Sequence, residues 1–97
     1  MAIPHIILFA DENCSGGHTH VCEAMIYIGD YFNDVTSSFI ILEGNWQFFQ
    51  DENFANQMGD FAEGHSGTLG PGVYNWIEDP NTLGANTNDR LSSLKPV

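Results

Sequence analysis

The sequence predicts an all-β fold built from a duplicated unit, and three observations lead to that prediction. The apolar runs are short, rich in Ile, Phe, Tyr and Trp, and bounded by Gly, Asn, Asp and Pro, which is typical of strands. The segment Phe-x-Asp-Glu-Asn occurs twice, at residues 9–13 and 49–53. The segment Asn-Asp-x-x-Ser-Ser also occurs twice, at residues 33–38 and 88–93. Because internal repeats set an architecture, two matched pairs in one short chain indicate a duplication.

The apolar runs predict strands because each combines β-branched or aromatic residues and ends near a turn-forming residue. In chain order these strands cover residues 3–9, 19–24, 36–42, 46–50, 57–61 and 91–95. Residues 73–77 suit either a strand or a short helical turn. The Gly-rich residues 64–72 predict a turn and loop.

The link between the two units is residues 43–45, Glu-Gly-Asn, which favour a tight turn. This link is too short to be a flexible linker, so we expect the two halves to share one core. A chain of 97 residues also suits one domain. We therefore expect a single domain over residues 1–97, with the first unit at about 1–43 and the second at about 45–97.

The chain is strongly acidic, with 13 Asp and Glu residues against Arg90 and Lys95, for a formal net charge of -11. Binding to nucleic acid or to an anionic membrane needs clustered basic residues, so we exclude both partners. No apolar run approaches the ~20 residues of a membrane-spanning helix, and no basic segment of a secretory signal is visible. An extracellular and a cytoplasmic location both stay open.

The repeated Asn-Asp-x-x-Ser-Ser segments place side-chain oxygens close together, and oxygen ligands suit a hard cation, above all Ca²⁺. Asn, Asp and Ser also stabilise ordinary turns by bonding to the backbone, which is the alternative for a single copy. Two in-phase copies, each with its own hairpin segment, favour calcium. Arg90 lies inside the second copy, and its charge should weaken that site unless the side chain points to solvent.

These motifs resemble the βγ-crystallin superfamily, whose unit is a Greek key, two of which form a two-sheet antiparallel β-sandwich. The family hairpin reads aromatic, four residues, aromatic, one residue, Gly. Residues 9–16 follow this pattern, except that Cys14 occupies the place of the second aromatic residue. Residues 49–56 follow it with Asn56, the next best residue for positive φ, in place of Gly. Residues 69–74, Leu-Gly-Pro-Gly-Val-Tyr, match a family turn. The chain looks most like single-domain microbial and non-lens members that keep both calcium signatures.

The resemblance implies two composite calcium sites, and therefore two bound Ca²⁺ ions. In the family, each calcium loop supplies side-chain and main-chain oxygens, and a hairpin residue adds a main-chain carbonyl. Carried over by position, the ligands are Asp34, Ser37, Asp89 and Ser92 from the loops and Glu12 and Glu52 from the hairpins, while Asn33 and Asn88 hold the loops or lend an oxygen. Few of these ligands are charged, so we expect an affinity that is roughly micromolar to millimolar.

The segment from residue 14 to residue 22 contains a second cluster of possible ligands, namely Cys14, His18, His20 and Cys22. These four residues could bind Zn²⁺, although their spacing fits no standard zinc framework. The two cysteines could instead form a disulfide or stay as free thiols, and the sequence leaves all three alternatives open. We expect His5 and His65 to be isolated surface residues.

No catalytic constellation emerges from the sequence, so we do not expect an enzyme. The first remaining class is a calcium-binding module with a structural, stress or extracellular role, in which the ion stabilises the fold. The alternative is a proteinase inhibitor or another protein-binding module, because some microbial inhibitors share the fold that the resemblance implies. Residues 64–72 are the candidate loop for that alternative. We expect a monomer.

Overall fold

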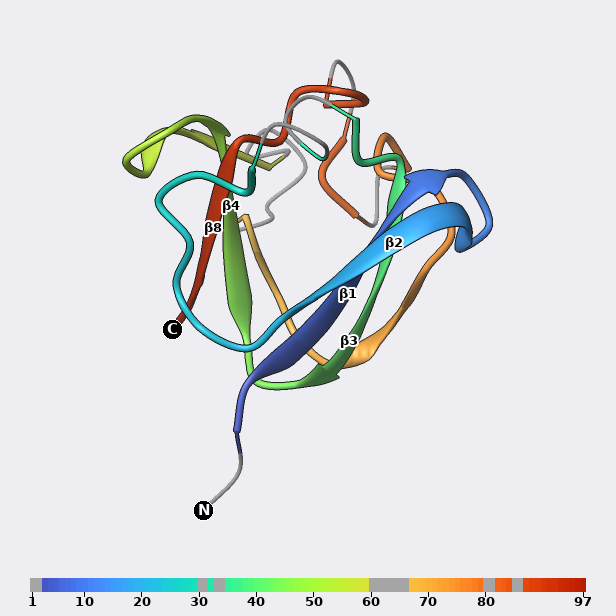
Figure 1. Cartoon of the computed structure of the whole chain (residues 1–97), viewed down its shortest axis with the longest axis horizontal. Coiled ribbons are helices and arrows are strands. Elements are labelled where there is room, and N and C mark those ends of the chain that lie inside the picture. The colour runs from blue at the N-terminus through green and yellow to red at the C-terminus, as the bar shows by residue number, and fades with distance from the viewer. Residues whose placement is uncertain (1–2, 30–31, 33–34, 60–66, 80–81, 85–86) are drawn as a thin grey trace.

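The computed structural model describes residues 3–29, 32, 35–59, 67–79, 82–84 and 87–97, and it confirms the all-β prediction (Figure 1). Every regular element among these residues is a strand. The strands are β1 (His5–Asp11), β2 (Ser15–Val21), β3 (Ser38–Glu43), β4 (Trp46–Asp51), β5 (Ala55–Met58), β6 (Thr68–Leu69), β7 (Gly72–Tyr74) and β8 (Ser93–Pro96). A bilayer-spanning helix is absent from the residues that the structure describes.

The strands form two antiparallel sheets, as predicted, which lie as two layers in Figure 1. The first sheet has the order β2-β1-β3-β7, and the second has the order β5-β4-β6, with β8 also paired to β4. Strand β7 comes from the second half of the chain but completes the first sheet. In return, Met25 of the first half makes a bridge to Leu94 of β8. Each sheet therefore combines segments from both halves, which ties the halves together.

The core lies between the sheets and follows the period-2 alternation of the strands. In β1, Ile6 and Leu8 are fully buried while their neighbours are half-exposed. The largest fully buried side chains are Trp46, Phe39 and Phe48. The rings of Phe39 in the first sheet and Phe48 in the second lie 4.8 Å apart, centroid to centroid. Burying each such side chain stabilises the fold by about 2 kcal/mol, so this contact is a main link between the layers.

Both β-hairpins turn through consecutive residues in the left-handed conformation. Asn13 and Cys14 have φ of 60° and 53°, and Asn53 and Phe54 have φ of 60° and 57°. The predicted positive φ of Asn56 is confirmed at 59°, and its side-chain amide hydrogen-bonds to the Asp51 carboxylate. Left-handed residues outside glycine cost free energy, so the matching strain in the two hairpins reflects a shared geometric requirement.

The strand boundaries differ from the predicted ones in several places. Strand β2 begins directly after the hairpin turn, four residues earlier than predicted, because the turn returns the chain at once to its partner. The predicted strand at 73–77 covers only 72–74, so the strand alternative is right for its first part. Within the predicted loop 64–72, residues 68–69 form β6 against β4, while residues 64–66 lie outside the described residues. Between β2 and β3, the first half contributes the isolated bridge of Met25 to Leu94.

Candidate metal centre

The last serine of the first Asn-Asp-x-x-Ser-Ser motif joins its loop to the hairpin of the same half. The Ser38 hydroxyl donates to the Asp11 carbonyl at 2.5 Å and accepts from the Cys14 amide at 2.9 Å. Ser38 is fully buried, so both hairpin groups depend on this one hydroxyl. The serine therefore fixes the first hairpin against the first loop.

The second half repeats this arrangement. The Ser93 hydroxyl donates to the Asp51 carbonyl at 2.6 Å and accepts from the Phe54 amide at 3.1 Å. Ser93 is also fully buried. The repetition explains why a serine closes each Asn-Asp-x-x-Ser-Ser motif, since the hydroxyl acts as donor and acceptor within one turn.

Ser37 and Ser92, which precede these two serines in the chain, are held by backbone hydrogen bonds. The Ser37 amide donates to the Phe9 carbonyl, and the Ser92 amide donates to the Phe49 carbonyl, each at 3.0 Å. Both phenylalanines open the repeated Phe-x-Asp-Glu-Asn segments. The loop and the hairpin of the same half are therefore docked by two equivalent contacts.

The opposite half supplies a third contact to each loop. The Ser37 carbonyl accepts from the Ile77 amide at 2.8 Å, and the Ser92 carbonyl accepts from the Ile28 amide at 3.0 Å. Ile77 follows β7 in the second half, and Ile28 lies between β2 and β3 in the first half. Each Asn-Asp-x-x-Ser-Ser loop is thus positioned by segments from both halves.

The two Asn-Asp-x-x-Ser-Ser loops also touch each other. The Ser37 hydroxyl donates to Asn88 Oδ1 at 2.7 Å and lies 3.5 Å from Asp89 Oδ1. The Asp89 amide donates to the Thr36 carbonyl at 3.3 Å. Three of the predicted ligands, separated by about fifty residues in the sequence, therefore form one group of oxygen atoms.

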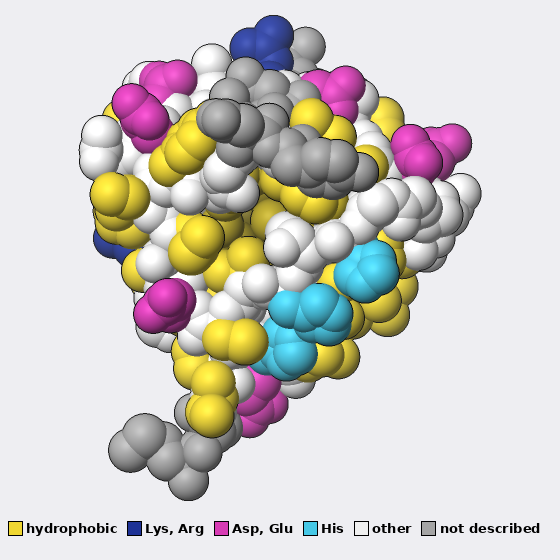
Figure 2. Space-filling view, viewed as in Figure 1, with side chains coloured by type: hydrophobic (Ala, Val, Ile, Leu, Met, Phe, Trp, Pro, Cys, Tyr) yellow, Lys and Arg dark blue, Asp and Glu magenta, His cyan; other side chains and the backbone are white. Residues whose placement is uncertain are grey.

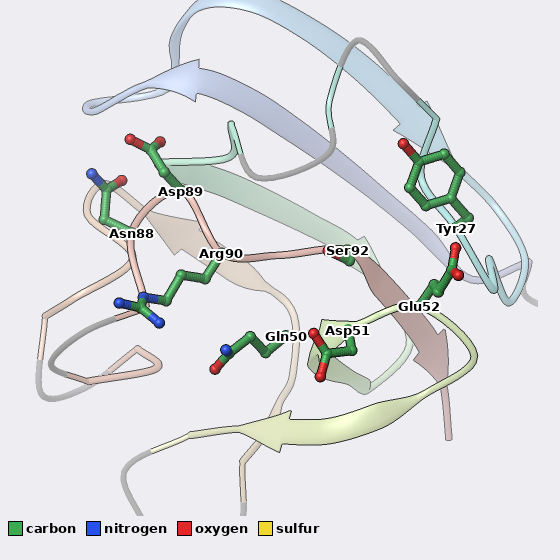
Figure 3. A pocket seen from close by; sticks show the side chains of 8 residues that line it. All are labelled: Tyr27, Gln50, Asp51, Glu52, Asn88, Asp89, Arg90 and Ser92. Atoms are coloured by element: carbon green, nitrogen blue, oxygen red, sulfur yellow. The ribbon is translucent and has the colours of Figure 1, made fainter.

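A surface hollow of about 760 Å³ lies beside this group (Figure 3). It is lined by Tyr27, Gln50, Asp51, Glu52, Asn88, Asp89, Arg90 and Ser92. In Figure 3 the hairpin carboxylates of Asp51 and Glu52 lie on one side, and Asn88 and Asp89 on the other. Four of the eight predicted ligands, Glu52, Asn88, Asp89 and Ser92, border this one hollow.

The profile of the family described as Beta/Gamma crystallin matches residues 5–97. The chain belongs to the beta/gamma-crystallin family. A Beta/gamma-crystallin of Ciona intestinalis is 35% identical over 91 residues, which cover 93% of this chain and 94% of that protein. A solved beta gamma crystallin structure from the same organism is 32% identical, has a TM-score of 0.76, and covers 96% of this chain and 99% of that one.

Two archaeal structures share the fold of this crystallin. A betagamma-crystallin from an archaeon has a TM-score of 0.78 at 22% identity, covering 99% of this chain and 100% of that chain. A transition-metal-ion-binding betagamma-crystallin from Methanosaeta thermophila has a TM-score of 0.71 at 27% identity, covering 94% and 98%. Together with the Ciona structure, they agree with the two-sheet antiparallel architecture.

The remaining predicted ligands, Glu12, Asn33 and Asp34, come from the first half of the chain. Glu12 is exposed in the first hairpin, and its carbonyl accepts from the Ser15 hydroxyl at 2.8 Å. Asn33 and Asp34 lie outside the described residues. Among the residues that are described, no three His, Cys, Asp or Glu side chains converge as metal ligands. The oxygen group of this crystallin instead mixes hydroxyl, amide and carboxylate oxygens, which suit a hard cation better than a transition metal.

The second Asn-Asp-x-x-Ser-Ser loop is held by residues that the sequence did not single out. Asp89 is left-handed, with φ of 58°, and the preceding Asn88 amide donates to Glu78 Oε2 at 3.1 Å. The buried Thr87 hydroxyl donates to the Gly84 carbonyl at 2.7 Å. Glu78 belongs to no motif, so only the folded structure could reveal its contact. Asp51, in contrast, stands in the repeated segment, and its side chain could have been predicted from that repeat.

The two basic residues lie in different environments. Arg90 is exposed and lines the hollow, and Figure 3 shows the Asp89 carboxylate directed away from the Arg90 guanidinium. Lys95 Nζ lies 5.6 Å from the ring centroid of Phe49 and 5.3 Å from that of Phe54. Arg90 therefore shares the hollow with Asn88 and Asp89, whereas Lys95 lies over the two phenylalanine rings.

The structure decides among the alternatives for the cysteines and differs from the expectation for His5. Cys14 and Cys22 are free thiols, so the disulfide alternative is wrong, and the proposed zinc cluster of these cysteines with two histidines is not assembled. Burial raises the pKa of the Cys14 thiol, opposed by its hydrogen bond with Ser38. His5 is not isolated, because its Nε2 lies 2.8 Å from His20 Nδ1. His65 lies outside the described residues.

Proposed function

We propose that this beta/gamma-crystallin is a calcium-binding module in which two composite Ca²⁺ sites stabilise the fold. The observation that carries the proposal is the 2.7 Å contact between Ser37 of the first loop and Asn88 of the second, with Asp89 at 3.5 Å. Folding brings these oxygens together beside the hollow that Glu52 and Ser92 border. A site divided in this way exists only in the folded chain.

The contacts of Ser37 with Asn88 and Asp89 support a specific pairing of the loops. We assign Ser37 and Glu12 of the first half to one site with Asn88 and Asp89 of the second half. The duplication then assigns Ser92 and Glu52 to the other site with Asn33 and Asp34. A bound Ca²⁺ would supply only charge and coordination, and its water ligands would fill the positions that the few protein oxygens leave open.

The charge of the chain supports cation binding in general, since a net charge of -11 attracts counter-ions to the surface. The Methanosaeta thermophila relative binds transition-metal ions, so a cation site is compatible with this fold. The oxygen chemistry of the present loops favours Ca²⁺, and their low charge favours an affinity that is roughly micromolar to millimolar.

Calorimetric titration of chelator-treated protein with CaCl₂ tests the proposal. We expect about two equivalents of binding, with Asp34→Ala and Asp89→Ala each removing about one equivalent. Glu43→Gln is the matched control, because it removes an exposed negative charge outside both loops. Absence of binding at millimolar Ca²⁺, or an equal loss of binding in the Glu43→Gln control, would contradict the proposal.

Stabilisation by the ion follows from binding to the folded state alone. A hundredfold excess of Ca²⁺ over the dissociation constant stabilises the protein by ~2.7 kcal/mol. For a domain of this size that corresponds to a rise in Tm of roughly 4–8 °C per kcal/mol. Mg²⁺ should stabilise less, because it dehydrates reluctantly and requires octahedral geometry. Equal Tm values in chelator and in saturating Ca²⁺ would remove the stabilising role.

The alternative of a proteinase inhibitor or protein-binding loop gains no support from the described residues. Within the candidate loop 64–72, residues 68–69 are paired in β6 and residue 72 begins β7. We also propose that residues 1–97 form one domain of two Greek keys and that this domain is a monomer. The proposal includes no enzymatic activity and no nucleic acid or membrane partner. Size-exclusion chromatography with light scattering checks the monomer.

A further inference from the structure

The described histidines gather on the outer face of the first sheet, apart from the residues assigned to calcium. Strands β1 and β2 place Ile7 opposite His20. His5 stands two residues before Ile7, and His18 two residues before His20, so alternation directs all three imidazoles to the same face. Figure 2 shows the histidine side chains lying together on the surface of the molecule.

The distance between two of these rings fits a pair of metal ligands. His5 Nε2 and His20 Nδ1 are 2.8 Å apart, and the two ring centroids are 5.1 Å apart. Two metal–nitrogen bonds of ~2.0 Å that enclose a right angle place their nitrogens ~2.8 Å apart, whereas a tetrahedral angle requires ~3.3 Å. This 2.8 Å contact is a hydrogen bond between the two rings, which an ion bound by both nitrogens would replace. The same spacing suits the cis positions of a tetragonal site, which Cu²⁺ and Ni²⁺ prefer.

The backbone places the two histidines on adjacent strands before any ion binds. His5 and His20 stand on adjacent strands whose pairing continues over Ile6, Ile7, Leu8 and Phe9. A ligand pair on two hydrogen-bonded strands loses little conformational entropy when it binds, which favours affinity. Neither Arg90 nor Lys95 contacts this face, because they lie at the hollow and over two phenylalanine rings.

We propose that His5 and His20 form a transition-metal site, distinct in ligands and in metal class from the calcium sites. Water completes the coordination, because no third His, Cys, Asp or Glu among the described residues converges on the pair. His18 is the neighbour, with its ring centroid 5.6 Å from that of His20. Imidazole ligands should bind Cu²⁺ more tightly than Ni²⁺ or Zn²⁺, and they should have essentially no affinity for Ca²⁺.

Titration with NiCl₂ in the presence of saturating Ca²⁺ tests the site without oxidising the thiols. We expect one Ni²⁺ to bind, and His5→Gln and His20→Gln each to weaken it by about tenfold or more. His18→Gln should weaken binding less than either of these. Asp89→Ala should leave Ni²⁺ affinity unchanged, which separates this site from the proposed function. All three histidines are on a strand surface, and melting curves confirm that each variant folds.

Spectroscopy of Cu²⁺ in the Cys22→Ser variant counts the ligands directly. We expect an electron paramagnetic resonance spectrum of a tetragonal Cu²⁺ centre with nitrogen hyperfine splitting, which disappears when His5 or His20 is replaced. Ni²⁺ binding that is unchanged in both histidine variants would overturn the proposal. Ni²⁺ binding that Ca²⁺ displaces would also overturn it, because the ion would then occupy the carboxylate-containing loops.

Discussion

The two halves of this crystallin share their hydrogen-bonding frame but differ in the side chains packed around it. Ser38 and Ser93 make the same pair of contacts to their hairpins, with distances that agree within a few tenths of an ångström. Around them, Cys14 of the first hairpin corresponds to Phe54 of the second. The comparison shows that the frame, rather than the packing, is the feature that both halves require.

The sharpest difference is the residue that precedes the two serines. Thr36 in the first loop and Leu91 in the second are both fully buried. The Thr36 hydroxyl has no hydrogen-bond partner among the described residues, whereas Leu91 belongs to the core cluster. The first loop thus places a polar atom where the second places an apolar side chain, and the first loop should be the less stable.

The largest expected effect is the loss of Leu91. Leu91→Ala creates a cavity in the core and should lower the free energy of unfolding by about 2–5 kcal/mol. The equivalent change Thr36→Ala removes an unpaired hydroxyl as well as a methyl group, so it should cost far less. Urea unfolding in excess chelator measures both without a calcium contribution. Equal losses at the two positions would show that the halves do not differ at this layer.

The next effect tests the shared frame. Ser38→Ala and Ser93→Ala each leave a hairpin amide and a carbonyl without their partner, which should cost about 1–3 kcal/mol. We expect the two losses to be similar, since the contacts are equivalent. Ser15→Ala is the control, because the Ser15 hydroxyl bonds to Glu12 at an exposed position. A large loss in one half and none in the other would contradict an equivalent frame.

The sequence was sufficient for the elements and repeats but not for contacts between distant segments. The all-β class and the positive φ of Asn56 followed from local composition and from the repeat. The sequence could not place β6 or the start of β2, because strand pairing decides these boundaries. A β-strand forms only where a partner satisfies its backbone, and that partner is set by the whole fold.

The candidate sites divide in the same way. The repeated motif predicts which residue types could bind calcium, but the contact of Ser37 with Asn88 joins residues 51 positions apart, which no local pattern predicts. The expectation that His5 would be isolated was wrong because His20 reaches it only through the register of β1 and β2. Register depends on the hairpin turn, and the predicted strand 19–24 had missed where that turn ends.

A smaller effect of opposite sign should follow when the unpaired hydroxyl is replaced without a change of shape. Thr36→Val exchanges the hydroxyl for a methyl group and should raise the free energy of unfolding by about 1 kcal/mol. Thr87→Val is the matched control, because the buried Thr87 hydroxyl donates to Gly84 and should destabilise when lost. Destabilisation by Thr36→Val would show that the hydroxyl has a partner in the folded protein.

The smallest expected effect is a loss of stability at alkaline pH. It should arise in the first hairpin, where Cys14 occupies the position of Phe54 in the second. Burial raises the pKa of the Cys14 thiol above its ordinary value of 9.0, partly opposed by the hydrogen bond with Ser38. Below that value the thiol is protonated in both the folded and the unfolded states, so it adds no pH dependence. Above it the unfolded chain releases its proton first, and stability falls as the pH rises through the folded pKa.

Cys14→Ala should therefore flatten the fall in stability above about pH 9, whereas Cys22→Ser, at an exposed thiol, should not. Urea midpoints measured from about pH 8 to about pH 10 give the slope for each variant. Burial also raises the pKa of Tyr74 above 10.0, so its contribution has the same sign but begins at higher pH. If the wild-type slope survives in Cys14→Ala, the alkaline loss does not arise from this hairpin, and the two halves are equivalent in their pH response.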